Sequence, residues 1–415
     1  MARDPKLSRR RLLRLAAVGG LGLVGARIFL PQWLRVGPAR PLEGEVAEFV
    51  EGLFADIDRA RVWDVHAHLI GSGDGGSGCR VADSVRSFLN PVERLRYEIY
   101  LAATGVREDG QMDATYVERL LDLQRLANPE GRLILLALDE AVAPEGELPS
   151  LPVPFFTPNE YVLELASRHV EFEAGVSIHP YRSDAAERVR AAAAGGARLV
   201  KWLPAVQGID PSSPLCDPFY EALADVGMPL LTHAGAEAAM EGNRQVLGNP
   251  LLLRRPLDAG VKVIVAHAAS LGEDVDLDAP PESPGLLPSW TLLLRLMDEP
   301  RYERLLFADI SAITQFNRCG RPLRAVLRAG HLHHRLLNGS DYPLPAVDPL
   351  VSTWKLVQEG YLTDRERELC NQVYDANPLL YDFVVKRCLK LEERGRVHRF
   401  APNVFETSWL FSQGA

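Results

Sequence analysis

The sequence predicts an α/β protein in which short apolar strands alternate with helices. Five apolar runs of strand length each end in a polar residue, at 61–68, 198–201, 229–233, 261–267 and 336–341. The intervals between the later runs are long enough to hold helices. Hydrophobic residues make up 47% of the 415 residues, which is enough for a large core.

The first run carries two histidines, His66 and His68, one residue apart. Side chains alternate along a strand, so both imidazoles project to the same side and form a bidentate clamp for a metal ion. A lone His-x-His pair arises often by chance, and its weight here comes from the polar residues that end the later strands. These residues are Lys201, His233, His267 and Asp341.

The order His-x-His, Lys, His, His, Asp on successive strand ends resembles the amidohydrolase superfamily of metal-dependent (β/α)8 barrels. The segments 231–235 (LTHAG) and 338–343 (NGSDYP) are similar to its amidohydrolase-related branch, which includes aminocarboxymuconate-semialdehyde decarboxylase. The resemblance implies a TIM barrel over 45–395 with a helical and loop insertion after strand one and C-terminal helices.

The elements of this barrel follow in chain order. A helix predicted at 45–61 leads into the first strand, and helices at 91–104 and 116–127 belong to the insertion. Strands at 132–138, 174–179 and 305–310 complete the set of eight with the five runs given above. The remaining helices are predicted at 185–194, 217–226, 249–259, 351–359, 364–377 and 379–394, and an irregular tail at 396–415.

The resemblance implies that His66, His68, His233 and Asp341 hold one ion, with His267 close by. Imidazole and carboxylate ligands around an open position suit zinc best, followed by iron, manganese and cobalt. A bound divalent metal lowers the pKa of water, and Asp341 or His267 would take or pass the proton.

Lys201 allows two versions of the site. In binuclear relatives, a carbamylated lysine on strand four bridges two metal ions. In the decarboxylase-like branch one ion suffices, and Lys201 would contact the substrate. The context of Asp341 favours the version with one ion, and the sequence permits one or two.

Two further residues are predicted to line the substrate pocket, His179 and Arg182, which follow the strand at 174–179. The metal ligands of the family lie on other strands, and Arg182 can bind a substrate carboxylate in a bidentate manner.

The expected function is hydrolysis of a small-molecule amide, lactone or ester by a metal-activated water. The alternatives are nonoxidative decarboxylation of a small carboxylic acid and, from another class, an inactive barrel that binds a metal or ligand. The net charge of −9 and the lack of a long basic run in the body argue against nucleic acid as a partner. A homo-oligomer is compatible with the sequence.

Residues 1–36 are predicted to be a twin-arginine signal or N-terminal anchor. The segment 8–14 (SRRRLLR) closely resembles the bacterial twin-arginine motif, and a short apolar region follows it. We therefore expect the twin-arginine export machinery as a partner and a periplasmic or membrane-anchored location facing the periplasm. The alternative is a basic amphipathic helix on a cytoplasmic protein.

Replacing Arg9 and Arg10 by Lys is expected to stop export in a bacterial host, because the export machinery reads the arginine pair. Cell fractionation of both forms measures the effect. Equal amounts of the two forms in the periplasm, or a wild type confined to the cytoplasm, would contradict the prediction.

Overall fold

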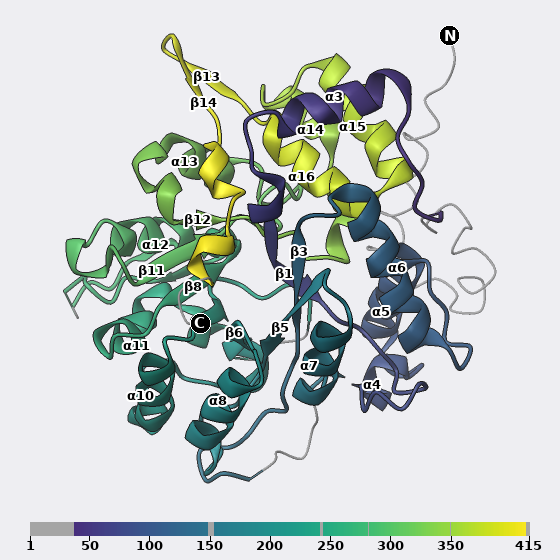
Figure 1. Cartoon of the computed structure of the whole chain (residues 1–415). Helices are drawn as coiled ribbons and strands as arrows, with labels where there is room; N and C mark the ends of the chain where they lie inside the picture. Colours follow the sequence, from purple (N-terminus) through teal and green to yellow (C-terminus); the bar gives the residue numbers. More distant parts are fainter. Residues whose placement is uncertain (1–36, 148–152, 241–243, 281, 349, 412–415) are drawn as a thin grey trace.

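The centre of the computed structural model is a sheet of eight parallel strands, surrounded by helices (Figure 1). The structure describes residues 37–147, 153–240, 244–280, 282–348 and 350–411, so the predicted leader at 1–36 lies outside the described residues. In sheet order the strands are β1 (Trp63–His68), β3 (Arg132–Leu136), β5 (Phe172–Val176), β6 (Leu199–Trp202), β7 (Leu230–His233), β8 (Val263–Ala266), β11 (Leu306–Asp309) and β12 (Leu336–Leu337).

The two outer strands of this order, β1 and β12, meet and close the sheet. The backbone N–H of Val65 donates to the carbonyl of Asn338 at 3.0 Å, and the N–H of Asp341 donates to the carbonyl of His66 at 2.7 Å. A parallel bridge between Ala67 and the residue after Asp341 continues the seam. The closed sheet of eight strands confirms the predicted (β/α)8 barrel.

Helices surround the barrel, and three of them form the insertion between β1 and β3, as predicted. Those of the insertion are α4 (Asp83–Arg86), α5 (Pro91–Thr104) and α6 (Met112–Ala127). The others are α3 (Gly44–Phe54), α7 (Asn159–Arg168), α8 (Ala185–Ala194), α9 (Pro204–Gln207), α10 (Asp217–Val226), α11 (Arg254–Asp258), α12 (Ser289–Met297), α13 (Arg321–Arg328), α14 (Thr353–Gln358), α15 (Asp364–Ala376) and α16 (Pro378–Cys388).

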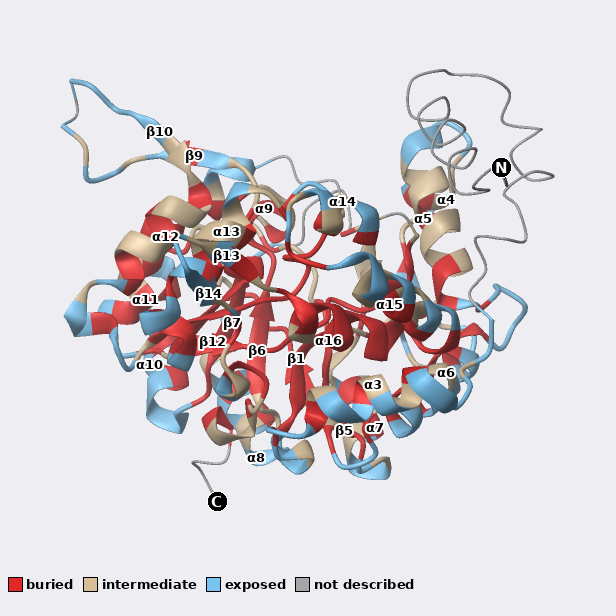
Figure 2. Ribbon diagram, turned by 90° about the horizontal axis from the view of Figure 1, so that it is seen from above, coloured by how far each residue is buried: buried red, intermediate tan, exposed pale blue. Residues whose placement is uncertain are grey.

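Three short antiparallel pairs of strands lie outside the barrel. They are β2 (Arg80–Val81) with β4 (Phe155–Phe156), β9 (Glu273–Val275) with β10 (Leu286–Pro288), and β13 (Leu391–Glu393) with β14 (Arg396–His398). The β9–β10 pair projects away from the barrel, with exposed residues at its tip (Figure 2).

The helix predicted at 379–394 is too long. Helix α16 ends at Cys388, and the following residues form β13, which pairs with β14 in the region that was expected to be irregular. Arg394 and Gly395 connect the two strands with φ values of 49° and 73°. A two-residue turn with both residues in the left-handed region matches the twist of a hairpin, and it reverses the chain between β13 and β14.

The helix predicted at 45–61 is also too long. Helix α3 ends at Phe54, and a separate 3-10 turn at Arg59–Arg61 precedes β1. The side chain of Asp58 accepts a hydrogen bond from the N–H of Ala60 at 3.1 Å. Such a local bond caps the new turn and competes with continuation of the helix.

Two layers of apolar side chains make up the core. One fills the space between the sheet and the helices, and the other fills the barrel itself, where strands appear as buried segments in Figure 2. The lower end of the barrel interior is closed by the C-terminal residues Leu410 and Phe411. The ring of Phe411 stacks on that of Trp63, the first residue of β1, with centroids 5.9 Å apart.

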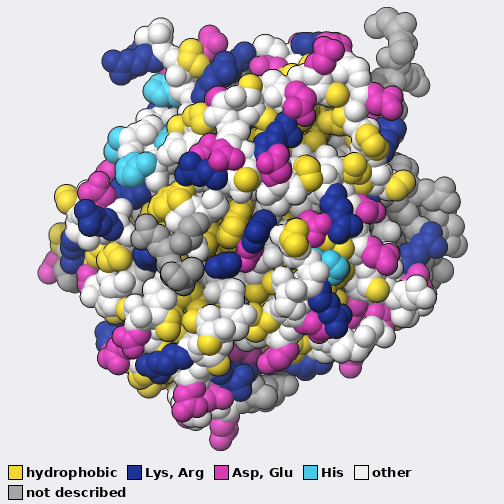
Figure 3. All heavy atoms as spheres, in the orientation of Figure 1, with side chains coloured by type: hydrophobic (Ala, Val, Ile, Leu, Met, Phe, Trp, Pro, Cys, Tyr) yellow, Lys and Arg dark blue, Asp and Glu magenta, His cyan; other side chains and the backbone are white. Residues whose placement is uncertain are grey.

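Within the described residues, none of the helices is long and apolar enough to cross a membrane. On the face shown in Figure 3, basic and acidic side chains are interspersed. All five cysteines are buried free thiols. The division of the chain into a leader, a barrel and a tail stays a prediction.

Truncating Phe411 to Ala is expected to lower the free energy of unfolding by about 3 kcal/mol, because it opens a cavity at the floor of the barrel. Urea unfolding followed by tryptophan fluorescence measures the change. The control is Val397→Ala in the same tail, whose side chain is exposed and should change stability by less than about 0.5 kcal/mol. Equal effects of the two variants would show that the tail does not seal the barrel.

Candidate active site

The polar residues at the strand ends point into the barrel because they follow buried residues with the spacing of a strand. Leu199, Leu231 and Phe307 fill the barrel interior, and each lies two residues before a polar residue on the same strand. Those polar residues are Lys201, His233 and Asp309, which therefore form a layer above the apolar one. This layer lies at the C-terminal face of the barrel, where barrel enzymes hold their active sites.

Asp341 lies at the centre of a group of imidazoles. Its Oδ1 atom is 3.1 Å from Nε2 of His68 and 3.6 Å from Nε2 of His66, and its Oδ2 atom is 3.9 Å from Nε2 of His267. The ligand atoms of His66, His267 and Asp341 lie within 4.8 Å of one another, and all three residues are buried. The structure thus brings together three of the four residues predicted to hold one ion, His66, His68 and Asp341, and places His267 beside them, as expected.

The backbone at Asp341 and His267 adopts the left-handed region, with φ values of 61° and 56°. This conformation costs a non-glycine residue about 1–2 kcal/mol. For Asp341 it is held by the hydrogen bond from its N–H to the carbonyl of His66. The cost is offset by the surrounding structure, as is common where side chains are aimed at a functional site.

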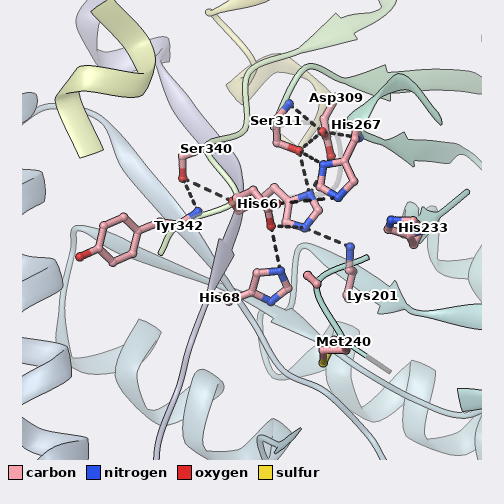
Figure 4. Close-up of polar contacts among 12 residues, drawn as sticks. His66, His68, Lys201, His233, Met240, His267, Asp309, Ser311, Ser340 and Tyr342 are labelled. Atoms are coloured by element: carbon pink, nitrogen blue, oxygen red, sulfur yellow. Dashed lines mark hydrogen bonds and ion pairs between the residues drawn. The ribbon is translucent and has the colours of Figure 1, made fainter. Parts of the chain in front are cut away.

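Asp309, at the end of β11, was not among the predicted site residues. Its Oδ2 atom is 2.9 Å from Nδ1 of His66, and its Oδ1 atom accepts hydrogen bonds from the N–H groups of His267 and Ser311, both at 2.9 Å (Figure 4). The Ser311 hydroxyl also donates to Asp309 and lies 2.7 Å from Nδ1 of His267. One carboxylate therefore orients both imidazoles.

These contacts set the tautomers of the two histidines. A carboxylate only accepts, so Nδ1 of His66 carries the proton, and the Ser311 hydroxyl, which donates to Asp309, accepts from Nδ1 of His267. Both Nε2 atoms then carry their lone pairs on the side of Asp341. Burial lowers the pKa of His66 and His267 well below the ordinary value, so both are neutral at pH 7. Neutral imidazoles beside a carboxylate are a donor set that fits a divalent metal.

Lys201 is buried, and its Nζ atom lies 3.1 Å from Nε2 of His66. Burial lowers the pKa of Lys201 to about 8, while Asp309 and Asp341 oppose that shift. Since Nδ1 of His66 is protonated, Nε2 is the acceptor in this contact. A metal ion would use the same lone pair, so Lys201 and the ion compete for it.

His233 faces a second carboxylate that the sequence analysis missed. Its Nε2 atom lies 3.3 Å from Oε2 of Glu237, whose other oxygen accepts from the N–H groups of Ala239 and Met240. The His233 and His267 rings are in edge contact, with centroids 5.2 Å apart. Burial lowers the pKa of His233 to about 4, although Glu237 opposes that shift. His233 thus adjoins the group around Asp341 but has a carboxylate of its own.

Arg318 is a buried cation close to this cluster and was also missed. Its Nη1 atom donates to the hydroxyl of Ser270 at 3.0 Å, and its Nε atom has no hydrogen-bond partner among the described residues. The positive charge of Arg318 helps to lower the pKa of Glu237 and opposes the rise that burial causes in the pKa of Asp341. The site therefore contains a second cation besides Lys201.

His179 and Arg182 lie in a different set of contacts. The Nε2 atom of His179 is 3.1 Å from the carbonyl oxygen of Gln207. The Nε and Nη2 atoms of Arg182 donate to the two carboxylate oxygens of Asp139 at 2.9 and 2.7 Å. The carboxylate that Arg182 binds is thus one of the protein's own, and the assignment of both residues to substrate binding stays a prediction.

Asp309→Asn is expected to weaken metal binding about 10- to 100-fold, because an amide no longer fixes the orientation of His66 and His267. Titration of chelator-treated protein with Zn²⁺ or Mn²⁺ against a competing chelator measures the affinity. Asp274→Asn is the control, since Asp274 also accepts from a buried serine hydroxyl but lies outside the cluster. An unchanged affinity in Asp309→Asn would show that this carboxylate does not orient the ligands.

The amidohydrolase family model matches residues 63–378, which is most of the chain. No curated protein matches the sequence significantly.

Among solved structures, the chain is similar to an amidohydrolase from Burkholderia multivorans with bound HEPES (16% identity, 79% of this chain and 98% of that one, TM-score 0.39). It is also similar to 5-carboxyvanillate decarboxylase LigW from Sphingomonas paucimobilis (11% identity, 80% and 99%, TM-score 0.40). A third is LigW2 from Novosphingobium aromaticivorans with bound manganese (14% identity, 68% and 87%, TM-score 0.38). Likeness at this level does not extend to activity or substrate. The family match covers the whole set of strand-end residues described above, and the chain belongs to the amidohydrolase family of enzymes.

Proposed function

We propose that the protein is a metal-dependent hydrolase that attacks a small-molecule amide, lactone or ester with water. The convergence of the Nε2 atoms of His66 and His267 on the carboxylate of Asp341 carries this proposal. Both imidazoles are neutral and oriented through their Nδ1 atoms. A scaffold that only needed a stable barrel would gain nothing from burying these groups together.

The residues that would hold the ion are Asp341, His66 and His68, with His267 or His233 completing the set; zinc is the ion that we propose. A divalent metal in such a site polarises a carbonyl oxygen and lowers the pKa of water. The open contacts of the imidazole Nε2 atoms are compatible with one or two ions.

Asp341 is the group that we propose as the general base. Burial raises the pKa of Asp341, and the nearby His68 opposes that rise. A carboxylate with a raised pKa accepts a proton from water more readily at neutral pH. The proton would move from Oδ2 of Asp341 toward His267, whose Nε2 atom is 3.9 Å away.

Decarboxylation of a small carboxylic acid is the second candidate, and the two buried cations favour it. Lys201 and Arg318 both act on the charge of Asp341, and the Nε atom of Arg318 has no partner within the described part of the chain. A substrate carboxylate would provide that partner. Hydrolysis of a substrate that also carries a carboxylate would use the same two cations.

We propose that the protein is exported through the twin-arginine route. The segment 8–14 supports this proposal. This route carries folded proteins, which suits an enzyme that binds its metal before export. The proposed partners are thus the export machinery and a small-molecule substrate.

A panel of amides, lactones, esters and aromatic or aliphatic acids, tested with metal-loaded protein, is expected to reveal turnover of one class. Asp341→Asn should reduce kcat by about 10²–10⁴-fold, the range for loss of a general base. Asp274→Asn is the control and should retain activity. Asp382→Asn would be a poor control, because it disturbs a buried ion pair. Hydrolysis that persists in Asp341→Asn would exclude Asp341 as the base, and release of CO₂ would favour the second candidate.

Lys201→Ala separates the versions with one and two ions. If Lys201 is carbamylated and bridging, the variant should lose one of two metal equivalents and regain activity with a short-chain carboxylate. If Lys201 contacts the substrate, the metal content should stay at one equivalent and the loss should appear in kcat/KM. Elemental analysis measures the metal content of the wild type and of Lys201→Ala.

A further inference from the structure

A small cavity lies on the N-terminal side of the catalytic cluster, where the seam between β1 and β12 meets α3, α6 and α16. Its volume is about 40 Å³. A site for one water needs roughly 10–15 Å³ by the same measure, so the cavity has room for an ion and a water. Its apolar walls come from Phe54, Leu379 and Phe383, and its polar wall consists of Asp64, Asn338, Ser340 and Asp382 with Gln124, Asn128 and Arg132 at the periphery.

Two oxygen atoms on the polar wall have no hydrogen-bond donor in the described ranges. They are Oδ1 of Asn338 and Oδ1 of Asp382, and the two residues are only 5% and 3% exposed. A buried acceptor without a partner lowers the stability of the folded protein. Both residues line one cavity, which gives a ligand bound there access to both side chains.

The charges around the cavity do not balance. The carboxylates of Asp64 and Asp382 face one buried ammonium, that of Lys386, which donates to Asp382 at 2.5 Å and to the carbonyl of Gly339 at 2.6 Å. Arg132 is partly exposed and is already paired with Glu173. With both carboxylates ionised, one negative charge is uncompensated, and burial of an uncompensated charge is costly.

The acceptors are carboxylate, amide and hydroxyl oxygens, which are the donors that hard cations prefer. One missing positive charge corresponds to a monovalent ion. We propose that this cavity binds a monovalent metal cation, sodium or potassium, through oxygen atoms of Asp64, Asn338 and Asp382.

The position of this ion gives it a role distinct from that of the catalytic metal. Oδ1 of Asp64 accepts hydrogen bonds from the N–H of His66 at 2.9 Å and from the N–H of Ser340 at 2.8 Å. His66 is itself a proposed ligand, and Ser340 precedes Asp341. A cation on the carboxylate of Asp64 would fix both peptide groups, so the ion would stabilise the floor of the active site without touching the substrate.

Thermal unfolding of the full chain, loaded with its divalent metal, tests the proposal in KCl, NaCl and choline chloride at equal ionic strength. The unfolding midpoint is expected to be about 2–4 °C higher in KCl or NaCl than in choline chloride and to saturate with cation concentration. The salt with the larger shift identifies the preferred ion.

Two variants and a control make this test specific. Asn338→Leu should abolish the difference between the salts, and Asn338→Asp should lower the cation concentration that gives half of the shift, because it adds a negative charge at the site. Thr314→Val should keep the difference, since its hydroxyl is buried without a partner among the described residues but lies outside the cavity.

Crystals of the same protein grown with thallium(I) as a potassium substitute give a direct view. An anomalous peak between Asp64, Asn338 and Asp382 is expected. Equal unfolding midpoints in all three salts together with no anomalous peak would overturn the proposal and show that only water fills the cavity. If Asn338→Leu does not fold, the comparison of salts for the wild type and for Asn338→Asp still decides the test.

Discussion

The seam between the last and the first strand of the barrel is the constraint on which the active site depends. Oδ1 of Asp64 accepts from the N–H groups of His66 and Ser340, and the N–H of Asp341 donates back to the carbonyl of His66. A Cβ atom at Gly339 would lie 2.8 Å from Cβ of His66, so only glycine allows this approach. The imidazole of His66 and the carboxylate of Asp341 are therefore brought together by backbone contacts and not by their own attraction.

The active-site cluster contains several buried charges, and their balance bears on the chemistry that the site can support. Asp309, Asp341 and Glu237 face Lys201 and Arg318, while the imidazoles are held neutral by burial. One negative charge is in excess before any metal binds, which attracts a divalent cation. Once the cation is present, the excess becomes positive and favours anions. A pocket with this balance of charge would favour a divalent metal first and an electron-rich ligand second.

Much of the barrel and of the site could be predicted because periodicity carries the information. Polar residues at the ends of apolar runs, together with the resemblance to the amidohydrolase superfamily, predicted His66, His68, Lys201, His233, His267 and Asp341 as site residues. The structure brings His66, His68, His267 and Asp341 together, and Lys201 and His233 adjoin them. Asp309 obeys the same rule and was missed because a carboxylate at a strand end is common without a function. Its role became visible only through its contact with His66.

The remaining differences have a physical reason in tertiary contacts. Glu237 and Arg318 lie on loops whose course is set by packing, so no local pattern reveals that they reach the site. The end of α16 was misplaced because Arg394 and Gly395 adopt positive φ values, and Arg394 gives no sequence signal for that conformation. Sequence periodicity therefore locates strands well and turns poorly.

The stacking of Phe411 on Trp63 has a consequence for the order of folding. The floor of the barrel joins the first residue of the first strand to residues near the end of the described chain. Contacts between such distant segments form late, after the cost of closing a long loop has been met. The barrel can begin to assemble during synthesis, but its interior is sealed only when Leu410 and Phe411 have been made and can pack against Trp63. For a protein proposed to be exported in the folded state, the packing of Phe411 on Trp63 would then be one of the last contacts to form before export.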